Sequence, residues 1–176
     1  MKRILIANFC LEIGGGEKLV FELVQFALEN NMKPTVFIID NYRKEYYDSV
    51  YKKMHVRVIR TRLDHIFSLK DPFKFLRALY WKIKLIYFAS ATYNSVQVVN
   101  LFTADKIREH IRHKKRFFWH IGNAIQYPDR RYTYSKEVFS NPDDSIVYIN
   151  RYQQQEIEAQ YGQIGARQVG FKLFLN

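Results

Sequence analysis

Three consecutive glycines follow an apolar run, 4–9, and precede an amphipathic run, 18–29. A glycine loop between a strand and a helix leaves main-chain N–H groups bare at the helix N-terminus, whose partial positive charge suits a phosphate. Glycine favours such a site because a larger residue would hold the ligand off. A plain strand-to-helix turn could have the same sequence, so both interpretations stay open. The candidate phosphate- or substrate-binding residues of this loop are Gly14, Gly15, Gly16, Glu17 and Lys18.

A second candidate residue, His120, ends an apolar run at 117–120. Open α/β sheets bind their ligands at the carboxyl ends of strands, so a histidine at such an end is a candidate catalytic residue. The alternative is a core histidine that is satisfied by a backbone carbonyl group. Cys10 also ends an apolar run, but no histidine partner is obvious near it, and we expect a buried spectator thiol.

The spacing of the glycines excludes two familiar nucleotide sites. The three glycines are followed by Glu17-Lys18-Leu19, so the chain lacks both the G-x-G-x-x-G pattern and the Gly-Lys-Ser/Thr ending of a P-loop. An NAD-dependent enzyme stays an alternative only through Asp40, which ends an expected strand where a ribose-binding acid could lie.

The elements that position these residues are the expected strands and helices, which appear as alternating apolar and amphipathic runs. This alternation predicts an α/β fold, a single Rossmann-like three-layer domain over 1–176 with a central, mostly parallel sheet of about six to seven strands. Asn150 should cap the last helix and Gly162 should end it. The expected buried face of the first helix consists of Leu19, Leu23, Phe26 and Ala27. We expect strands at 3–9, 35–39, 56–59, 96–101, 117–120, 145–149 and 168–170, and helices at 16–30, 42–54, 69–91, 103–113 and 151–161.

Composition narrows the class of partner. The chain has 176 residues, of which 48% are hydrophobic, so it can bury a core and is not a disordered protein. Its formal net charge of +11 favours an anionic partner: nucleic acid, an acidic bilayer surface or a phosphorylated substrate. The single cysteine excludes an internal disulfide and indicates a reducing compartment.

The segment 69–91 has the composition of an interfacial helix. An apolar stripe, Leu76, Leu79, Ile83 and Ile86, is accompanied by cationic and aromatic residues, as membrane-surface binding requires. The alternative is a core helix with solvated lysines. No apolar run reaches the roughly 20 residues that span a bilayer. The candidate membrane-surface residues are Lys74, Arg77, Trp81 and Lys84.

Four short stretches resemble retaining GT-B glycosyltransferases of family 4, in the order in which that family has them. The loop 13–18 resembles the family's I-G-G-A-E-R loop, and 118–120 resembles the strand that ends in its active-site histidine. The strand 145–149, with the helix after it and Tyr161-Gly162, resembles the I-x-V-S…Y-G stretch. The end of the chain, 174–176, resembles the I-x-N-G-V-D linker up to its Asn.

The resemblance implies the N-terminal, acceptor-side domain of a nucleotide-sugar-dependent glycosyltransferase. The C-terminal domain, which holds the nucleotide-sugar in that family, would be absent from this chain, so the fragment alone should bind donor poorly and turn nothing over. The glycine amides would face the donor diphosphate, and His120 would hydrogen-bond the transferred sugar near its hydroxymethyl group. No cofactor or metal is expected, and no Asp-x-Asp motif appears.

The resemblance also implies a glycan or lipid-linked acceptor, as in cell-envelope polysaccharide synthesis. The expected location is the cytoplasm, with possible peripheral attachment to the inner face of the cytoplasmic membrane. Asn150 stands where the family commonly has Ser, and the loop after Gly122 is unusually basic. The alternative function is a basic Rossmann-like module that binds nucleic acid or another polyanion. We do not expect nucleic acid as the partner, because no RNA- or DNA-binding signature appears.

Overall fold

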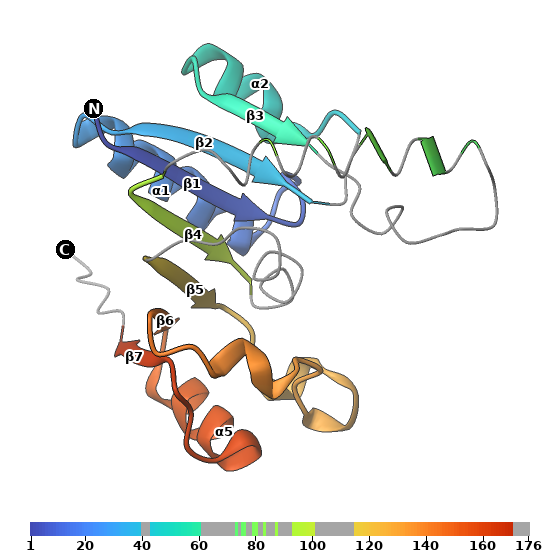
Figure 1. Cartoon of the computed structure of the whole chain (residues 1–176), viewed down its shortest axis with the longest axis vertical. Helices are drawn as coiled ribbons and strands as arrows, with labels where there is room; N and C mark the ends of the chain where they lie inside the picture. Colours follow the sequence, from blue (N-terminus) through green and yellow to red (C-terminus); the bar gives the residue numbers. More distant parts are fainter. Residues whose placement is uncertain are drawn as a thin grey trace.

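The computed structural model describes residues 1–39, 43–60, 73, 75, 76, 79, 80, 83, 87, 93–100 and 115–170. Its centre is one seven-stranded sheet in the order β3-β2-β1-β4-β5-β6-β7, with every neighbouring pair parallel (Figure 1). The predicted α/β, Rossmann-like fold is therefore confirmed. The strands are β1 (Arg3–Asn8), β2 (Lys33–Ile38), β3 (Arg57–Arg60), β4 (Ser95–Val99), β5 (Arg116–His120), β6 (Asp144–Tyr148) and β7 (Arg167–Gly170).

Three longer helices and three short 3-10 helices are described over their whole length. The longer ones are α1 (Gly15–Glu29), α2 (Tyr46–Lys53) and α5 (Arg151–Tyr161). The short ones, η2 (Ala124–Gln126), η3 (Pro128–Arg130) and η4 (Lys136–Phe139), all lie in the segment that the sequence predicted as loop. The expected helix at 103–113, Asp40 and the linker-like 174–176 lie outside the described residues.

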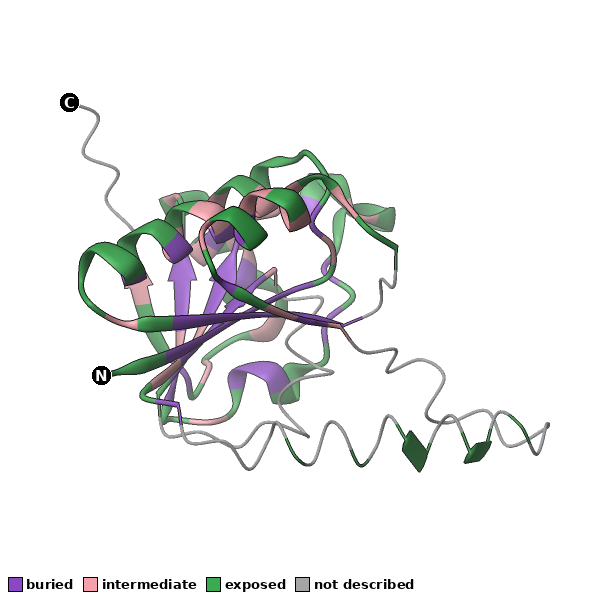
Figure 2. Ribbon diagram, turned by 90° about the horizontal axis from the view of Figure 1, so that it is seen from above, coloured by how far each residue is buried: buried purple, intermediate pink, exposed green. Residues whose placement is uncertain are grey.

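The sheet carries a separate apolar core on each face, because successive side chains of a strand point to opposite sides. On one face α1 and α2 cover the strands with residues such as Val20, Val24 and Tyr51. On the other face Ile157 of α5 and Phe139 of η4 cover them. Figure 2 shows the buried strands in the middle and helical segments on both sides. A sheet covered on both faces explains why its strands read as continuous apolar runs.

The buried face of α1 differs from the expected one. Val20, Val24 and Ala27 are buried, whereas Leu19 and Leu23 are half-buried and Phe26 is 54% exposed. Two overlapping apolar stripes run along this helix, and the one that faces the sheet depends on how the glycine bend directs the helix across β1.

Helix α5 has the predicted boundaries because both of its ends are encoded locally. The side chain of Asn150 accepts a hydrogen bond from the Gln153 N–H at 3.1 Å, and the Gln153 side chain accepts one from the Asn150 N–H at 3.3 Å. Gly162 ends the helix with a φ of 72°, a left-handed conformation that favours glycine.

A buried ion pair joins the amino-terminal ends of β5 and β6. Arg116 donates two hydrogen bonds to Asp144, both at 2.7 Å, and the two residues are register partners in the sheet. Both side chains are almost completely buried. This pair fixes the two strands at the edge of the sheet opposite to the strand tips, where His120 lies.

The described residues of the segment 69–91 are helical and exposed. Leu76, Leu79 and Ile83 of the apolar stripe are 64%, 43% and 58% exposed. The candidate membrane-surface residues Lys74, Arg77, Trp81 and Lys84 lie outside the described residues. In the described part of the chain, no helix combines the length and apolar character that crossing a bilayer requires.

Candidate functional site

The glycine bend lies where the strand order reverses. The chain runs from β1 to β2 and β3 on one side, and then returns to place β4 on the other side of β1. Ligands of open α/β sheets bind outside the carboxyl ends of the strands at this switch point. The fold thus gives the bend between β1 and α1 the position of a ligand site, which the plain-turn interpretation of the sequence did not require.

The bend starts α1 without a side-chain cap. Gly14 is the N-cap residue in an extended conformation, and its carbonyl accepts the first helical hydrogen bond from the Lys18 N–H at 3.0 Å. No side-chain hydrogen bond caps the helix at this residue. The position of a Cβ on Gly15 would have no atom of the described residues within 4 Å, so the described part of the chain leaves the space beside this residue open. First-turn amides beside open space are what an anion needs at a helix N-terminus.

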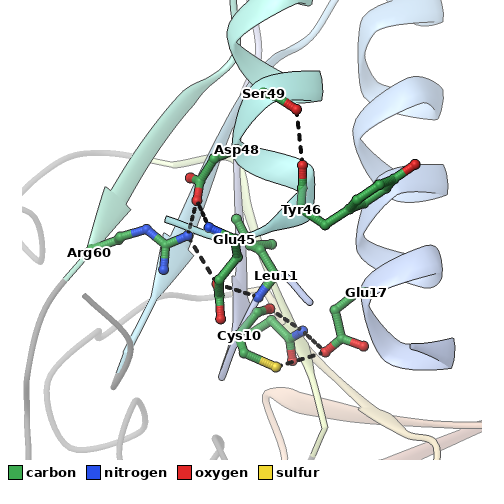
Figure 3. Close-up of polar contacts among 9 residues, drawn as sticks. Cys10, Leu11, Glu17, Glu45, Tyr46, Asp48, Ser49 and Arg60 are labelled. Atoms are coloured by element: carbon green, nitrogen blue, oxygen red, sulfur yellow. Dashed lines mark hydrogen bonds and ion pairs between the residues drawn. The ribbon is translucent and has the colours of Figure 1, made fainter. Parts of the chain in front are cut away.

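The Glu17 side chain stabilises the bend by hydrogen bonds to the end of β1 and to the residue pair that follows it. Its Oε1 accepts hydrogen bonds from Asn8 Nδ2 at 3.1 Å and from Cys10 Sγ at 3.2 Å, and Figure 3 shows the Cys10 and Glu17 side chains turned toward each other. Its Oε2 occupies the space that a Cβ on Gly14 would need. The structure therefore places the Glu17 carboxylate on the protein side of the bend, and the glycine at 14 makes room for it.

Cys10 and Lys18, which also lie near the bend, are not arranged for catalysis. Burial, followed by the hydrogen bond to Glu17, raises the pKa of Cys10 to about 12, so the sulfur is a neutral thiol at physiological pH. The Lys18 side chain is 73% exposed and lies 3.9 Å from Glu22 one helical turn on. Lys18 thus lies on the solvent side of α1.

Residues that the sequence analysis did not single out hold the loop between β1 and α1. The Leu11 N–H donates to Glu45 Oε2 at 2.7 Å, and Arg60 Nη2 donates to the same oxygen at 3.0 Å (Figure 3). Arg60 also bonds to Asp48 at 2.6 Å. The loop after β1 is thereby tied to the start of α2 and the end of β3. The reciprocal Glu45–Asp48 capping box of α2 was the sequence signal available for this contact.

The bend and His120 lie at the same edge of the sheet. A Cβ on Gly16 would lie 3.0 Å from Cδ1 of Ile121, the residue after His120, and 3.9 Å from Cγ1 of Val99 at the end of β4. The bend therefore packs across β4 onto the loop that follows β5. The structure brings together the two regions that the sequence singled out.

The imidazole of His120 nevertheless points to the other face of the sheet. Successive side chains of β5 point to opposite faces of the sheet. Trp119 belongs to the core on the α1 side, so His120 lies on the opposite face together with Phe118, which belongs to the core on the α5 side. Tyr132, Tyr134 and Tyr148 surround the imidazole, with ring centroids at 4.8, 6.2 and 6.1 Å from its own. The bend and the imidazole share an edge of the sheet but do not face each other.

His120 is fully buried, and neither of its ring nitrogens has a hydrogen-bond partner among the described residues. Burial lowers its pKa to about 4, and the negative charge of Glu156 opposes this shift in part. The ring is therefore neutral at pH 7 and can offer one donor and one acceptor. Asn123 Oδ1 and the Tyr148 hydroxyl are also buried, and the described part of the chain offers them no hydrogen-bond partner. Unsatisfied polar atoms at the end of a strand are a chemical signal for a polar ligand.

A cavity of about 530 Å³ lies between the segment after β5 and α5, next to the tyrosines around His120. Glu156 connects the cavity with these tyrosines. It lines the cavity and accepts hydrogen bonds from the Tyr132 hydroxyl and the Ala124 N–H. The sequence analysis noted the basic character of this loop but missed Tyr132 and Glu156, because they meet only through the packing of α5 against it. The cavity is lined by Ala124, Ile125, Arg130, Arg131, Glu156, Ala159 and Gln160.

No protein-family model and no curated protein matches this chain. Within the described residues, no group of three or more His, Cys, Asp or Glu side chains could hold a metal ion. The geometry can thus offer bare amides for an anion at the bend and, at the end of β5, a neutral imidazole behind a ring of tyrosines. The resemblance to family 4 glycosyltransferases stays a hypothesis.

Proposed function

We propose that this chain is the acceptor-side domain of a nucleotide-sugar-dependent, retaining glycosyltransferase of the GT-B type. The observation that carries the proposal is the position of the uncapped glycine bend at the switch point of the sheet, packed against the residue after His120. A second, nucleotide-sugar-binding domain would complete the site. The acceptor would be a glycan or lipid-linked molecule.

In this proposal the bend acts on the leaving group. Negative charge grows on the donor diphosphate as the sugar departs, and main-chain amides fixed beside Gly15 and Gly16 would stabilise that charge without reorganising. The Glu45–Leu11 and Glu17–Cys10 hydrogen bonds hold the loop before the bend in one conformation. That rigidity supports the role, because preorganised donors cost little at the moment of transfer.

His120 would bind the transferred sugar as a neutral hydrogen-bonding group. Its lowered pKa suits this task, since an uncharged imidazole can both donate to and accept from a sugar hydroxyl. The ring is enclosed by Tyr132, Tyr134 and Tyr148, so the proposal requires these side chains to move aside when substrate binds. The unpartnered ring nitrogens support this role.

The phosphate role of the bend can be tested on this chain alone. Amide signals of the labelled protein are recorded by NMR during titration with nucleoside diphosphate sugars such as UDP-glucose and GDP-mannose. The expected result is a shift of the Gly15 and Gly16 signals that Gly15→Glu abolishes. Gly170→Glu is the matched control, because a side chain at Gly170 also meets nothing within 4 Å. Because the domain alone should bind donor weakly, the titration extends to saturating donor. Shifts that persist in Gly15→Glu, or no shift at the bend with any donor under these conditions, would overturn the proposal.

We also propose that the segment 69–91, whose described residues are helical, places the domain on an anionic membrane surface. Exposure of Leu76, Leu79 and Ile83 supports this, as does the net charge of +11. Wild-type protein should sediment with anionic vesicles, and Leu79→Glu/Ile83→Glu and Lys74→Glu/Arg77→Glu/Lys84→Glu should stay in solution. Phe26→Glu, on the exposed side of α1, is the control. Equal sedimentation of all variants, or retention on DNA but not on vesicles, would contradict membrane attachment.

A further inference from the structure

The cavity beside α5 is built around two arginines on a strained turn. Asp129 and Arg130 have φ values of 56° and 52°, a left-handed conformation that is unfavourable for residues other than glycine. The turn is held by hydrogen bonds from the Arg130 N–H to the Tyr127 carbonyl and from the Arg131 N–H to the Pro128 carbonyl, at 3.1 and 3.2 Å. Strain of this kind persists where the surrounding structure enforces it, commonly at ligand sites. Here two consecutive arginines, Arg130 and Arg131, line one cavity.

Neither guanidinium is neutralised by its surroundings. Arg130 and Arg131 are both exposed, and neither forms an ion pair with a carboxylate in the described part of the chain. The described acidic group in the lining is Glu156, which is engaged with the Ala124 N–H and the Tyr132 hydroxyl. Two arginines against one carboxylate leave a net positive lining. Planar guanidinium groups bind phosphate through paired hydrogen bonds, which a lysine cannot reproduce.

The side of the cavity formed by α5 is tied to the loop by hydrogen bonds and offers an acceptor. Gln160 accepts from the Tyr132 N–H and donates to the Tyr132 carbonyl, both at 2.8 Å, so both ends of its amide are engaged by the protein. Within the described residues, both hydrogen bonds of the Glu156 carboxylate go to Oε2, which leaves Oε1 able to accept from a ligand hydroxyl. The cavity therefore combines anion-binding donors with a hydroxyl-binding acceptor. Its volume of about 530 Å³ lies within the range of small-molecule pockets.

We propose that this cavity binds the phosphate ester of a hydroxylated molecule, such as a sugar phosphate. Arg130 and Arg131 hold the phosphate, and Glu156 accepts a hydroxyl hydrogen. Because the cavity lies beside the tyrosines that surround His120, we take its ligand to be the sugar acceptor. This assignment of the ligand as acceptor is the part of the inference that rests on the proposed function. Binding itself depends on the cavity alone.

Calorimetry on the intact chain tests the site with glucose 1-phosphate as the probe, inorganic phosphate for the anion alone and glucose for the hydroxyls alone. Glucose 1-phosphate should bind more tightly than either, and Arg130→Gln/Arg131→Gln should weaken it at least tenfold. The matched control, Arg151→Gln/Arg167→Gln, removes the same charge from two exposed arginines outside the cavity and should bind as wild type. Glu156→Gln should reduce the preference for glucose 1-phosphate over inorganic phosphate.

Several outcomes would overturn the inference: glucose binding as tightly as its phosphate, equal weakening in both double variants, or no binding of the phosphate ester. Vesicles that carry phosphatidylinositol distinguish a lipid headgroup from a soluble ligand. Arginine-dependent sedimentation with such vesicles would assign the phosphate to a lipid, and soluble binding would assign it to a free ester. The proposed function fails separately, since it depends on the donor-induced shifts at Gly15 and Gly16, which Arg130→Gln/Arg131→Gln should leave unchanged.

Discussion

The carboxylate of Glu17 occupies the space that a side chain at Gly14 would need. Asn8 and Cys10 hold the other oxygen of that carboxylate by hydrogen bonds of 3.1 and 3.2 Å, so moving the carboxylate aside would strain both bonds. Gly14 has a φ of −168°, which any residue can adopt. The glycine at this position is therefore required by packing against Glu17 and not by backbone conformation.

Gly14→Ala should destabilise the protein through this contact. Displacing Glu17 leaves the buried Asn8 side chain with one partner fewer, and we expect a loss of about 1–2 kcal/mol in the free energy of unfolding, measured with urea. Gly15→Ala is the control, because a side chain there meets nothing and alanine favours the helix. Equal stability of the two variants would show that Glu17 does not brace the bend.

The Cys10 thiol should resist alkylation in the folded protein. A pKa of about 12 leaves a thiolate fraction of about 0.0001 at pH 8, whereas an unfolded thiol with a pKa of about 8.5 is roughly one-quarter ionised. Iodoacetamide should therefore react at least about 1,000-fold more slowly with the native chain than with the chain in urea, as followed by mass spectrometry. Glu17→Gln should speed the native reaction, since it removes a carboxylate beside the sulfur. A native rate close to the unfolded rate would contradict a half-buried, neutral thiol at this position.

His120 should make the protein less stable in mild acid. Burial lowers its pKa from 6.5 to about 4, so the unfolded chain takes up a proton before the folded chain does. The contribution of neutral His120 to the free energy of unfolding is fully present above pH 6.5. It is lost as the pH falls toward 4, which lowers the free energy of unfolding by about 3 kcal/mol in total.

Urea unfolding at several pH values between 4 and 7 measures this loss. His120→Phe should remove the part of the pH dependence that comes from this ring. Replacing the exposed His55 by Gln should leave the wild-type profile. The same slope in His120→Phe as in wild type would place the imidazole in contact with solvent.

Removing one partner of the Arg116–Asp144 pair should lower the free energy of unfolding strongly, whereas replacing both partners by apolar residues should lower it little. Asp144→Asn leaves a buried guanidinium without its carboxylate, and we expect a loss of about 3–5 kcal/mol in the free energy of unfolding. The double variant Arg116→Met/Asp144→Leu should recover most of this loss, because no buried charge remains. Glu22→Gln, which breaks the exposed pair with Lys18, should change stability by less than about 0.5 kcal/mol. Similar effects of the two single variants would mean that the buried pair is solvated.

The sequence by itself predicted most of the sheet, because the strands of a sheet covered on both faces are continuous apolar runs. It also predicted both ends of α5, since the Asn150 cap and the Gly162 turn act within a few residues. The glycine bend was visible for the same reason. Each of these features is encoded within one short stretch of chain.

Tertiary structure decided the rest. Two apolar stripes on α1 were equally plausible, and contact with the sheet selected Val20, Val24 and Ala27. The sequence placed His120 at a strand tip, but only the register of β5 and the packing of residues 127–148 turned its ring away from the bend and enclosed it in tyrosines. The cavity with Arg130, Arg131 and Glu156 forms only when α5 packs beside the loop after β5. Local patterns determine elements, whereas a site of this kind depends on long-range contacts between them.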